Sequence, residues 1–303
     1  MEIKAWAYEE FPEFKDLPED AVLLQSDGNE TECHLICNVE YANIDGHPLL
    51  LQILRPFCRN EGEKLLPCIV FVQGSAWFEQ EIYVQLPMLA NLAKRGYVVA
   101  SVQYRHSGIA AFPAQARDTR NAIRFMKVNA DKYGIDPDKV IVSGDSSGGH
   151  TALFAGILQD DDTEYNLFPG VSADVKCIIS MYPSASAMFE DGYPTTINHH
   201  LPDSPEGQVM GGINLRERPD LCRKLSVECN IDPDTPIAPV FLIHGTKDRT
   251  VNSRQSTIVY NRLKECGKEA YLYYVAGGDH GGAEYWTDEI LTLEDEFIKN
   301  HLK

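Results

Sequence analysis

Six short apolar runs alternate with helical patterns along most of this chain, and that alternation restricts the possible folds more than any other feature. A short run that is apolar at every position is typical of a strand covered on both faces. The helical patterns between the runs are long enough to serve as right-handed crossovers between parallel strands. We therefore predict an α/β fold with a mostly parallel, doubly wound sheet. The expected strands are residues 68–72, 97–102, 140–143, 177–181, 240–243 and 270–275, and the expected helices are residues 82–94, 114–133, 147–158, 253–265 and 285–301.

Three segments depart from the alternation. Residues 32–41 and 48–55 predict an antiparallel hairpin at an edge of the sheet, connected through residues 43–46. Residues 9–20 are acidic and contain proline, so we expect an irregular amino-terminal arm. In residues 183–239, prolines and glycines interrupt any period between two strong strands, which predicts a small inserted cap. The whole chain is expected to form one domain with this insertion.

The acidic composition restricts the partners of the protein. The formal net charge is −18 and the isoelectric point is about 4.8, so nucleic acid or an acidic membrane surface would be repelled on average. The sequence has no run of about eighteen apolar residues, and its first residues lack the basic and apolar segments of a signal peptide. We expect a small-molecule substrate, no nucleic-acid or membrane partner and a cytoplasmic location. Edge strands of the sheet would allow a homodimer.

Eight cysteines are scattered through the expected strands, loops and one helix. Their positions lack the close paired spacing of a zinc site. The spacing of Cys222 and Cys229 could close a disulfide, but the missing signal peptide favours free thiols. We expect reduced cysteines, no bound metal and no other cofactor.

A glycine-rich turn follows the expected strand at residues 140–143. Residues 144–148, Gly-Asp-Ser-Ser-Gly, lead directly into a helical pattern, which is the context required of a G-x-S-x-G turn. Such a strained turn presents the Ser146 hydroxyl at the strand end. The helix start and the amide of Ser147 favour negative charge on a carbonyl oxygen that Ser146 attacks. We predict that Ser146 is a nucleophile; the alternative is a glycine-rich turn without reactivity.

A serine hydroxyl needs a base, and histidine has a suitable ordinary pKa of about 6.5. His280 lies in a glycine-rich loop after the expected strand at residues 270–275, which suits delivery of an imidazole to the strand ends. Asp248 follows the strand at residues 240–243, and we predict that it orients His280. A simple turn residue is the alternative for Asp248.

Neighbouring residues compete for these roles. His244 ends a strand and is interpreted as packing support for the site. Asp279 is adjacent to His280 and is expected to be a solvated loop acid, because sequence neighbours seldom bond in a triad geometry. His150, one helical turn after the nucleophile, is expected to be a buried histidine with a satisfied hydrogen bond.

The order Ser146, Asp248, His280 is the nucleophile, acid, base order of α/β-hydrolases. In that fold a second oxyanion donor follows an earlier strand, here at residues 73–77, Gln-Gly-Ser-Ala-Trp. Trp77 either walls the acyl pocket or belongs to the core.

Several motifs together resemble the esterase and lipase family that includes hormone-sensitive-lipase-like enzymes, bacterial acetylesterases and feruloyl esterases. The resemblance spans most of the chain and implies the α/β-hydrolase fold with Ser146, Asp248 and His280 as the triad. It also implies the amides of Ser147, Ser75 and Ala76 as oxyanion donors. The family usually has a His-Gly-Gly-Gly motif where this chain has Gln73 to Trp77. The matching residues are Tyr104-Arg105, Phe112-Pro113-Ala114-Gln115 with Asp118, Tyr133 to Pro137, Gly144 to His150, His244 to Asp248 and Asp279 to Gly282.

The resulting hypothesis is a serine esterase that cleaves short acyl esters through an acyl-enzyme on Ser146. By resemblance, the acyl groups would be acetyl or hydroxycinnamoyl groups, on carbohydrates among other alcohols. One alternative is a serine peptidase or amidase of the same fold, although the chain has no room for the propeller of prolyl-oligopeptidase-like enzymes. The other is a ligand-binding homologue without catalysis; such proteins usually lose a triad residue, and all three candidates are present here.

Overall fold

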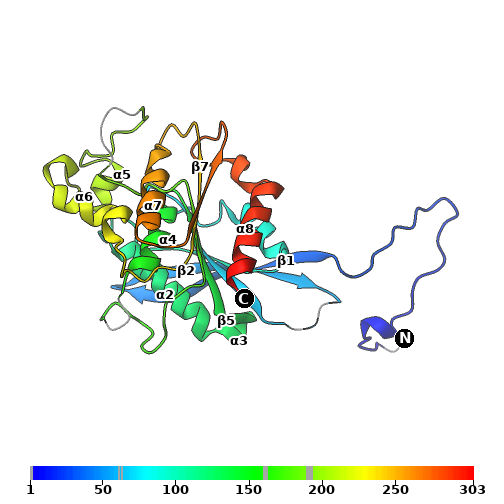
Figure 1. Cartoon of the computed structure of the whole chain (residues 1–303). Coiled ribbons are helices and arrows are strands. Elements are labelled where there is room, and N and C mark those ends of the chain that lie inside the picture. The colour runs from blue at the N-terminus through cyan, green and yellow to red at the C-terminus, as the bar shows by residue number, and fades with distance from the viewer. Residues whose placement is uncertain (1–2, 61, 63, 160–162, 189–193) are drawn as a thin grey trace.

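An eight-stranded sheet forms the centre of the computed structural model, which describes residues 3–60, 62, 64–159, 163–188 and 194–303. The strand order is β1-β2-β4-β3-β5-β6-β7-β8, with parallel pairing from β4 through to β8 (Figure 1). All six predicted parallel strands are present, and the predicted fold class is confirmed. They are β3 (Leu66–Val72), β4 (Val98–Val102), β5 (Ile135–Asp145), β6 (Ile178–Met181), β7 (Val240–Gly245) and β8 (Ala270–Val275).

The predicted hairpin lies at the edge of the sheet and is longer than expected. Strand β1 (Thr31–Ile44) pairs antiparallel with β2 (His47–Cys58), which in turn pairs antiparallel with β4. Asp45 and Gly46 have φ values of 54° and 83°, so a two-residue turn with two left-handed residues joins the strands. Such turns match the right-handed twist of a hairpin. Residues 43 and 44, predicted in the connection, therefore belong to β1.

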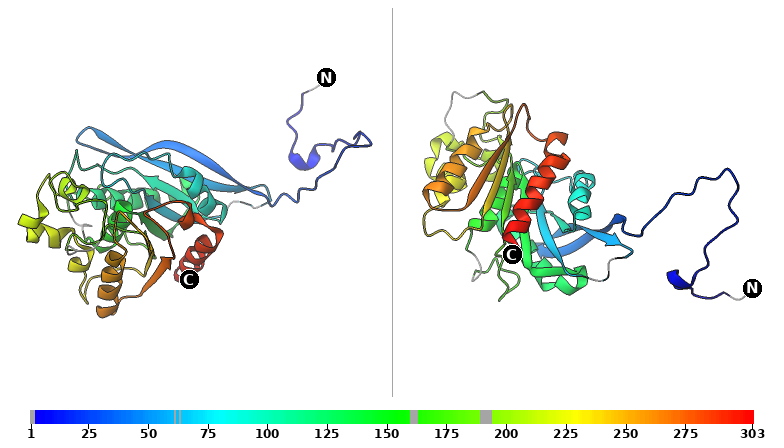
Figure 2. Two further views of the ribbon diagram at one scale, coloured as in Figure 1. Left: turned by 90° about the horizontal axis from the view of Figure 1, so that it is seen from above. Right: turned by 45° about the vertical axis from the view of Figure 1, so that its right-hand side comes forward.

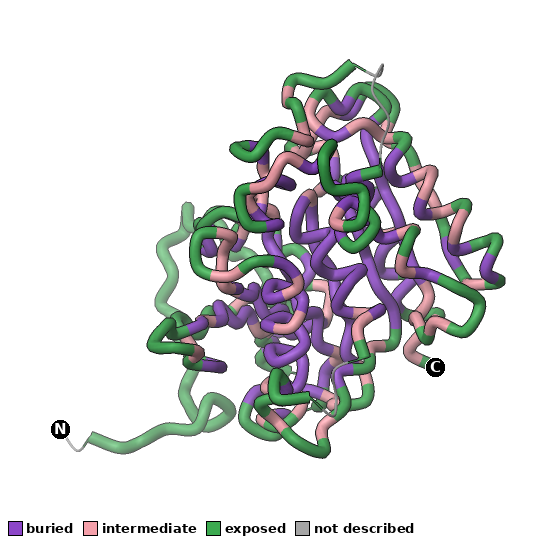
Figure 3. The backbone as a smooth tube through the Cα atoms, turned by 90° about the vertical axis from the view of Figure 1, so that its left-hand side faces the viewer, coloured by how far each residue is buried: buried purple, intermediate pink, exposed green. Residues whose placement is uncertain are grey.

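Helices cover both faces of the sheet and give three layers (Figure 2). Side chains alternate along β3: Ile69 and Phe71 face the layer with α1 and α8, whereas Val70 and Val72 face the layer with α2, α4 and α7. Continuous apolar runs result because both faces are buried, as the interior of Figure 3 shows. The helices are α1 (Leu86–Lys94), α2 (Ala114–Val128), α4 (Ser147–Ile157), α7 (Arg254–Glu265) and α8 (Asp288–His301).

Three predicted helices differ from the observed ones. The helix expected at residues 82–94 begins four residues later, at Leu86, after a turn at residues 82–85. The helix expected at residues 114–133 is divided at Asn129 into α2 and a short α3 (Ala130–Tyr133), which ends at Gly134 in a left-handed conformation. The helix expected from residue 285 begins at Asp288, capped by the Thr287 side chain, after the 3-10 turn η4 (Ala283–Trp286).

The connection between β6 and β7 is the segment predicted as a cap. Residues 189–193 of it lie outside the described residues. The described remainder is irregular apart from four short helices, α5 (Pro205–Val209), η2 (Leu215–Glu217), α6 (Pro219–Leu225) and η3 (Val227–Asn230). This segment covers one end of the sheet beside α7 (Figure 1).

The amino-terminal arm extends away from the body of the molecule (Figures 1 and 2). It is irregular except for the 3-10 turn η1 (Tyr8–Glu10), as predicted. No helix in the described part of the chain is long and apolar enough to cross a bilayer. All eight cysteines are free.

Candidate active site

The turn from β5 into α4 places Ser146 at the carboxyl end of the central strands. Ser146 has φ 52° and ψ −124°, a strained backbone conformation that presents its side chain outward. A Cβ atom on Gly148 would lie 2.0 Å from the carbonyl oxygen of Val72, and one on Gly144 would lie 2.4 Å from the carbonyl oxygen of Gly148. Strand and helix backbones therefore meet so closely that only glycine fits.

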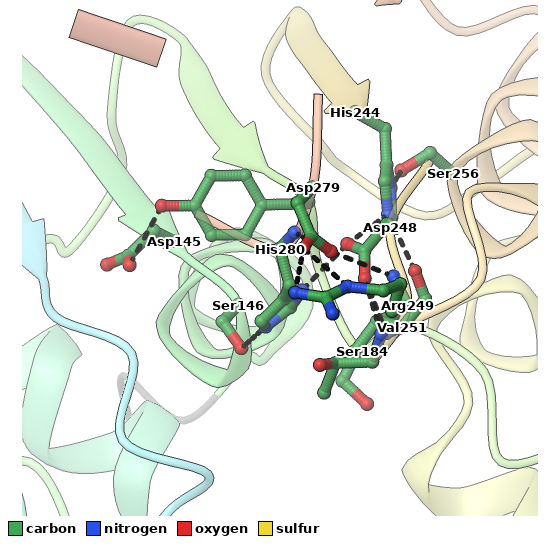
Figure 4. A network of polar contacts seen from close by, with 12 residues as sticks. Asp145, Ser146, Ser184, His244, Asp248, Arg249, Val251, Ser256, Asp279 and His280 are labelled. Atoms are coloured by element: carbon green, nitrogen blue, oxygen red, sulfur yellow. Dashed lines mark hydrogen bonds and ion pairs between the residues drawn. The ribbon is translucent and has the colours of Figure 1, made fainter. Parts of the chain in front are cut away.

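The three predicted triad residues meet at this point. Ser146 Oγ lies 2.8 Å from His280 Nε2, and His280 Nδ1 lies 2.7 Å from Asp248 Oδ2 (Figure 4). Ser146 follows β5, Asp248 follows β7 and His280 follows β8. Because parallel strands end at the same edge of a sheet, residues more than a hundred positions apart converge there.

The carboxylate of Asp248 receives four hydrogen bonds. Its Oδ1 accepts from the amides of Thr250 and Val251 at 2.9 and 2.7 Å, and its Oδ2 accepts from His280 and from His244 Nε2 at 3.0 Å. Burial opposes ionisation, but the bonds from His244 and His280 outweigh it and hold the pKa of Asp248 well below its usual range. Asp248 therefore stays ionised and keeps the Nδ1 proton of His280 in place.

His244 has a more direct role than packing support. The ring is fully buried, and its Nδ1 lies 2.7 Å from the hydroxyl of Ser256 on α7. When Nδ1 accepts from this hydroxyl, Nε2 carries the proton and donates to Asp248 Oδ2, with the carbonyl of Val251 as a second acceptor at 3.0 Å. The four-residue spacing of His244 and Asp248 was the available signal, but spacing alone does not reveal which way the ring faces.

The loop after β3 contains two of the three predicted oxyanion donors, Ser75 and Ala76, and the amide of one of them already donates a hydrogen bond within the protein. The amide of Ser75 donates to Ser147 Oγ at 3.0 Å, as does that of Trp77 at 3.2 Å. The prediction for Ser75 is therefore corrected, because its N–H points at a side chain. Within the described residues, the amides of Ala76 and Ser147 donate no hydrogen bond, so these two are available to an oxyanion.

The backbone of the loop after β3 is strained, because residues other than glycine occupy left-handed positions in it. Ala76 and Trp77 have φ values of 55° and 56°, in the left-handed region that residues with a Cβ rarely adopt. The amide of Gly74 is fixed by a 2.8 Å hydrogen bond to Asp145 Oδ1. The buried Asp145 carboxylate also accepts from Gln85 and Tyr182 at 2.9 and 3.2 Å, so it connects the strained loop to the nucleophile turn.

A cavity of about 440 Å³ opens beside Ser146 and His280. Trp77 is buried, lines this cavity and also belongs to the hydrophobic core, so its role in walling an acyl pocket stays a prediction. The other walls are mostly apolar, and the polar side chains of Ser184, His199 and Glu206 also line the cavity. An apolar cleft with a few placed polar groups is typical of a small-molecule site.

Two neighbouring residues had roles predicted for them, and His150 matches its prediction whereas Asp279 matches only in part. His150 is buried and donates from Nε2 to the carbonyl of Leu225 at 2.8 Å; burial lowers its pKa to about 4, so it is neutral. This confirms a buried helix histidine. Asp279 pairs with Arg249 at 2.7 Å and accepts from the amide of His280 at 2.9 Å, so it orders the loop as well as being a surface acid.

A nucleophile turn after the central strand, with the acid and histidine after later strands in that order, defines the α/β-hydrolase class. The family model described as BD-FAE matches residues 53–263. The chain therefore belongs to the BD-FAE family.

Individual relatives agree with this assignment. Esterase LipC of Mycobacterium tuberculosis is 27% identical over 221 residues, covering 72% of this chain and 53% of LipC. A truncated carbohydrate esterase from gut microbiota superposes with a TM-score of 0.74 at 25% identity, covering 91% of this chain and 98% of that one. An acetyl ester-xyloside bifunctional hydrolase from Caldicellulosiruptor lactoaceticus gives a TM-score of 0.66 at 25% identity over 84% and 87% of the two chains. The chain spans about half the length of the curated relatives it matches.

Proposed function

We propose that this protein is a serine carboxylic-ester hydrolase that acts on short acyl esters, with acetyl esters of carbohydrates as the preferred class. The observation that carries this proposal is the continuous contact from Ser146 Oγ through His280 to the ionised Asp248. A serine paired in this way becomes a strong nucleophile near neutral pH.

In the proposed reaction Ser146 Oγ attacks the ester carbonyl carbon while His280 Nε2 accepts the hydroxyl proton. The resulting oxyanion receives hydrogen bonds from the amides of Ala76 and Ser147. His280 then donates its proton to the leaving alcohol, and the carbon–oxygen bond breaks to leave an acyl-enzyme. A water molecule, deprotonated by His280, attacks this ester, and the acid departs as Ser146 regains its proton.

The preference for short acyl groups draws on the cleft and on the relatives. The cavity of about 440 Å³ is at the lower end of the range for small-molecule sites, which is about 300–1,000 Å³. Two structural relatives at 25% identity are named for carbohydrate ester or acetyl ester hydrolysis. A series of 4-nitrophenyl esters tests the preference: kcat/KM should be highest for acetyl or butyryl esters, and a preference for acyl chains of about eight or more carbons would contradict it.

A fluorophosphonate probe tests the nucleophile. We expect a covalent adduct on the peptide that contains Ser146, with loss of both the adduct and nearly all 4-nitrophenyl acetate turnover in Ser146→Ala. The matched control is Ser172→Ala, an exposed serine outside the cleft lining, which should label and turn over as wild type. Normal turnover by a folded Ser146→Ala protein would refute the proposed function.

A further inference from the structure

The inserted segment between β6 and β7 is bound to the loop that carries the triad acid. Thr195 Oγ1 donates to the carbonyl of Thr250 at 3.0 Å, and the amide of Thr196 donates to the carbonyl of Arg249 at 2.8 Å. His199 Nε2 lies 2.9 Å from the same Thr250 carbonyl oxygen. These contacts fall one and two residues after Asp248, whose Oδ1 accepts from the amide of Thr250.

The partners of His199 determine its charge. Its Nε2 lies 2.9 Å from the carbonyl oxygen of Thr250 and 3.3 Å from Thr195 Oγ1, and the Thr195 hydroxyl itself donates to the same carbonyl. Its Nδ1 lies 2.8 Å from Glu206 Oε1. Glu206 is 4% exposed and also accepts from the Ser184 hydroxyl at 2.6 Å. With the Thr195 proton directed at a carbonyl, both ring nitrogens face acceptors, an arrangement that favours a proton on each nitrogen and therefore the imidazolium form of His199. Burial opposes this charge, but the Glu206 carboxylate raises the pKa of His199 above its ordinary value.

We propose that His199 is a positioning residue: as an imidazolium paired with Glu206, it fastens the inserted segment to the Thr250 carbonyl and so fixes the loop that holds Asp248. This role rests on the proposed function, since it matters for activity only if Asp248 orients His280. The inserted segment then contributes to the active site itself, because His199 and Glu206 line the same cleft as Ser146 and His280.

Charged groups around His199 favour the cationic form. Among the described residues, the carboxylate of Glu206 faces it from α5 and that of Asp248 acts on it from the loop after β7. His280 lies in the same cleft wall. We call the contacts of His199 with Glu206 and with the Thr250 carbonyl the clamp. Because the pKa of His199 is raised, the clamp is complete below the ordinary imidazole pKa of about 6.5 and is lost as the pH rises through the raised pKa. We therefore expect a decline of kcat on the alkaline side of the pH profile.

The test uses the full chain and 4-nitrophenyl acetate from about pH 5 to about pH 10. His199→Asn keeps a donor towards Glu206 but cannot reach the Thr250 carbonyl, so kcat should fall by about tenfold to about a hundredfold and the alkaline decline should disappear. Glu206→Gln removes the carboxylate that holds the proton, so the decline should move to lower pH. The matched control is His200→Asn, the adjacent histidine outside the cleft lining, which should leave kcat and the profile unchanged.

The outcomes separate this role from the function on which it rests. If His199→Asn and Glu206→Gln both keep the wild-type kcat and pH profile while fluorophosphonate still labels Ser146, the clamp is refuted and the esterase assignment stands. If thermal melting shows that His199→Asn is unfolded, the profile of Glu206→Gln decides, and an unmoved alkaline decline overturns the proposal. Absence of label on wild-type Ser146 would refute the function itself.

Discussion

Asp248→Asn tests whether the acid of the triad acts by fixing one tautomer of His280. The amides of Thr250 and Val251 both donate to Oδ1, so the amide oxygen of the substituted side chain must take the Oδ1 position. Its NH2 group then occupies the Oδ2 position, where it faces His280 Nδ1, at present a donor at 2.7 Å. Two donors cannot face each other, so the proton of the neutral ring moves to Nε2 and confronts the Ser146 hydroxyl. The base is lost although every side chain stays in place.

The expected magnitude follows from that loss of the correct tautomer. In a serine triad the equivalent change lowers kcat by about 10⁴-fold, which corresponds to about 5 kcal/mol of transition-state stabilisation. The assay is kcat for 4-nitrophenyl acetate at neutral pH, with the thermal midpoint as a measure of folding. His244 Nε2 keeps the Val251 carbonyl as an acceptor at 3.0 Å, so we expect the variant to fold.

Asp279→Asn provides the matched control, because it removes the same charge from the residue next to His280. Asp279 bonds to Arg249 and to the His280 amide but not to the imidazole, so its loss should lower kcat by less than about tenfold. A folded Asp248→Asn enzyme within about tenfold of wild-type kcat would refute the tautomer argument. Equal losses in the two variants would show that loop charge, not ring orientation, is what the carboxylate supplies.

Two further predictions concern stability. Gly148→Ala would place a Cβ 2.0 Å from the Val72 carbonyl oxygen. Both atoms are fixed by the backbone, so we expect the free energy of unfolding, measured in urea, to fall by more than about 4 kcal/mol. A wild-type urea midpoint would contradict the packing argument. Burial raises the pKa of Glu294 to about 8, whereas the unfolded carboxyl ionises near its ordinary value of about 4.3. The folded state therefore loses stability as the pH rises between these two pKa values. Glu294→Gln should stabilise the protein by about 3 kcal/mol at pH 7 and by almost nothing near pH 4. A gain in stability that does not depend on pH would exclude the ionisation of Glu294 as its cause.

The strands and the meeting of Ser146, Asp248 and His280 could be predicted because their signals are local or topological. Burial on both faces produces continuous apolar runs such as residues 68–72 and 270–275, and the ends of parallel strands meet whatever the intervening sequence is. Ser146, Asp248 and His280 were therefore found from their positions after three strands and from their order along the chain.

Features that depend on side-chain orientation could not be predicted. Whether the Ser75 amide faces a substrate or Ser147 Oγ depends on the conformation of a strained loop, which motif letters do not encode. The bond from His244 to Asp248 depends on the direction of one ring. His199 and Glu206 lie in a segment without hydrophobic period, so no element could be assigned there and their pairing had no signal.

The row of contacts from Ser146 through His280, Asp248 and His244 ends at Ser256 on α7. The Ser146 hydroxyl is thus connected through side-chain contacts to a helix in the carboxyl-terminal third of the polypeptide. Because Ser256 lies in the first turn of α7, we expect fraying of that turn to disturb the His244 contact with Asp248 and to lower turnover while the central strands are still folded.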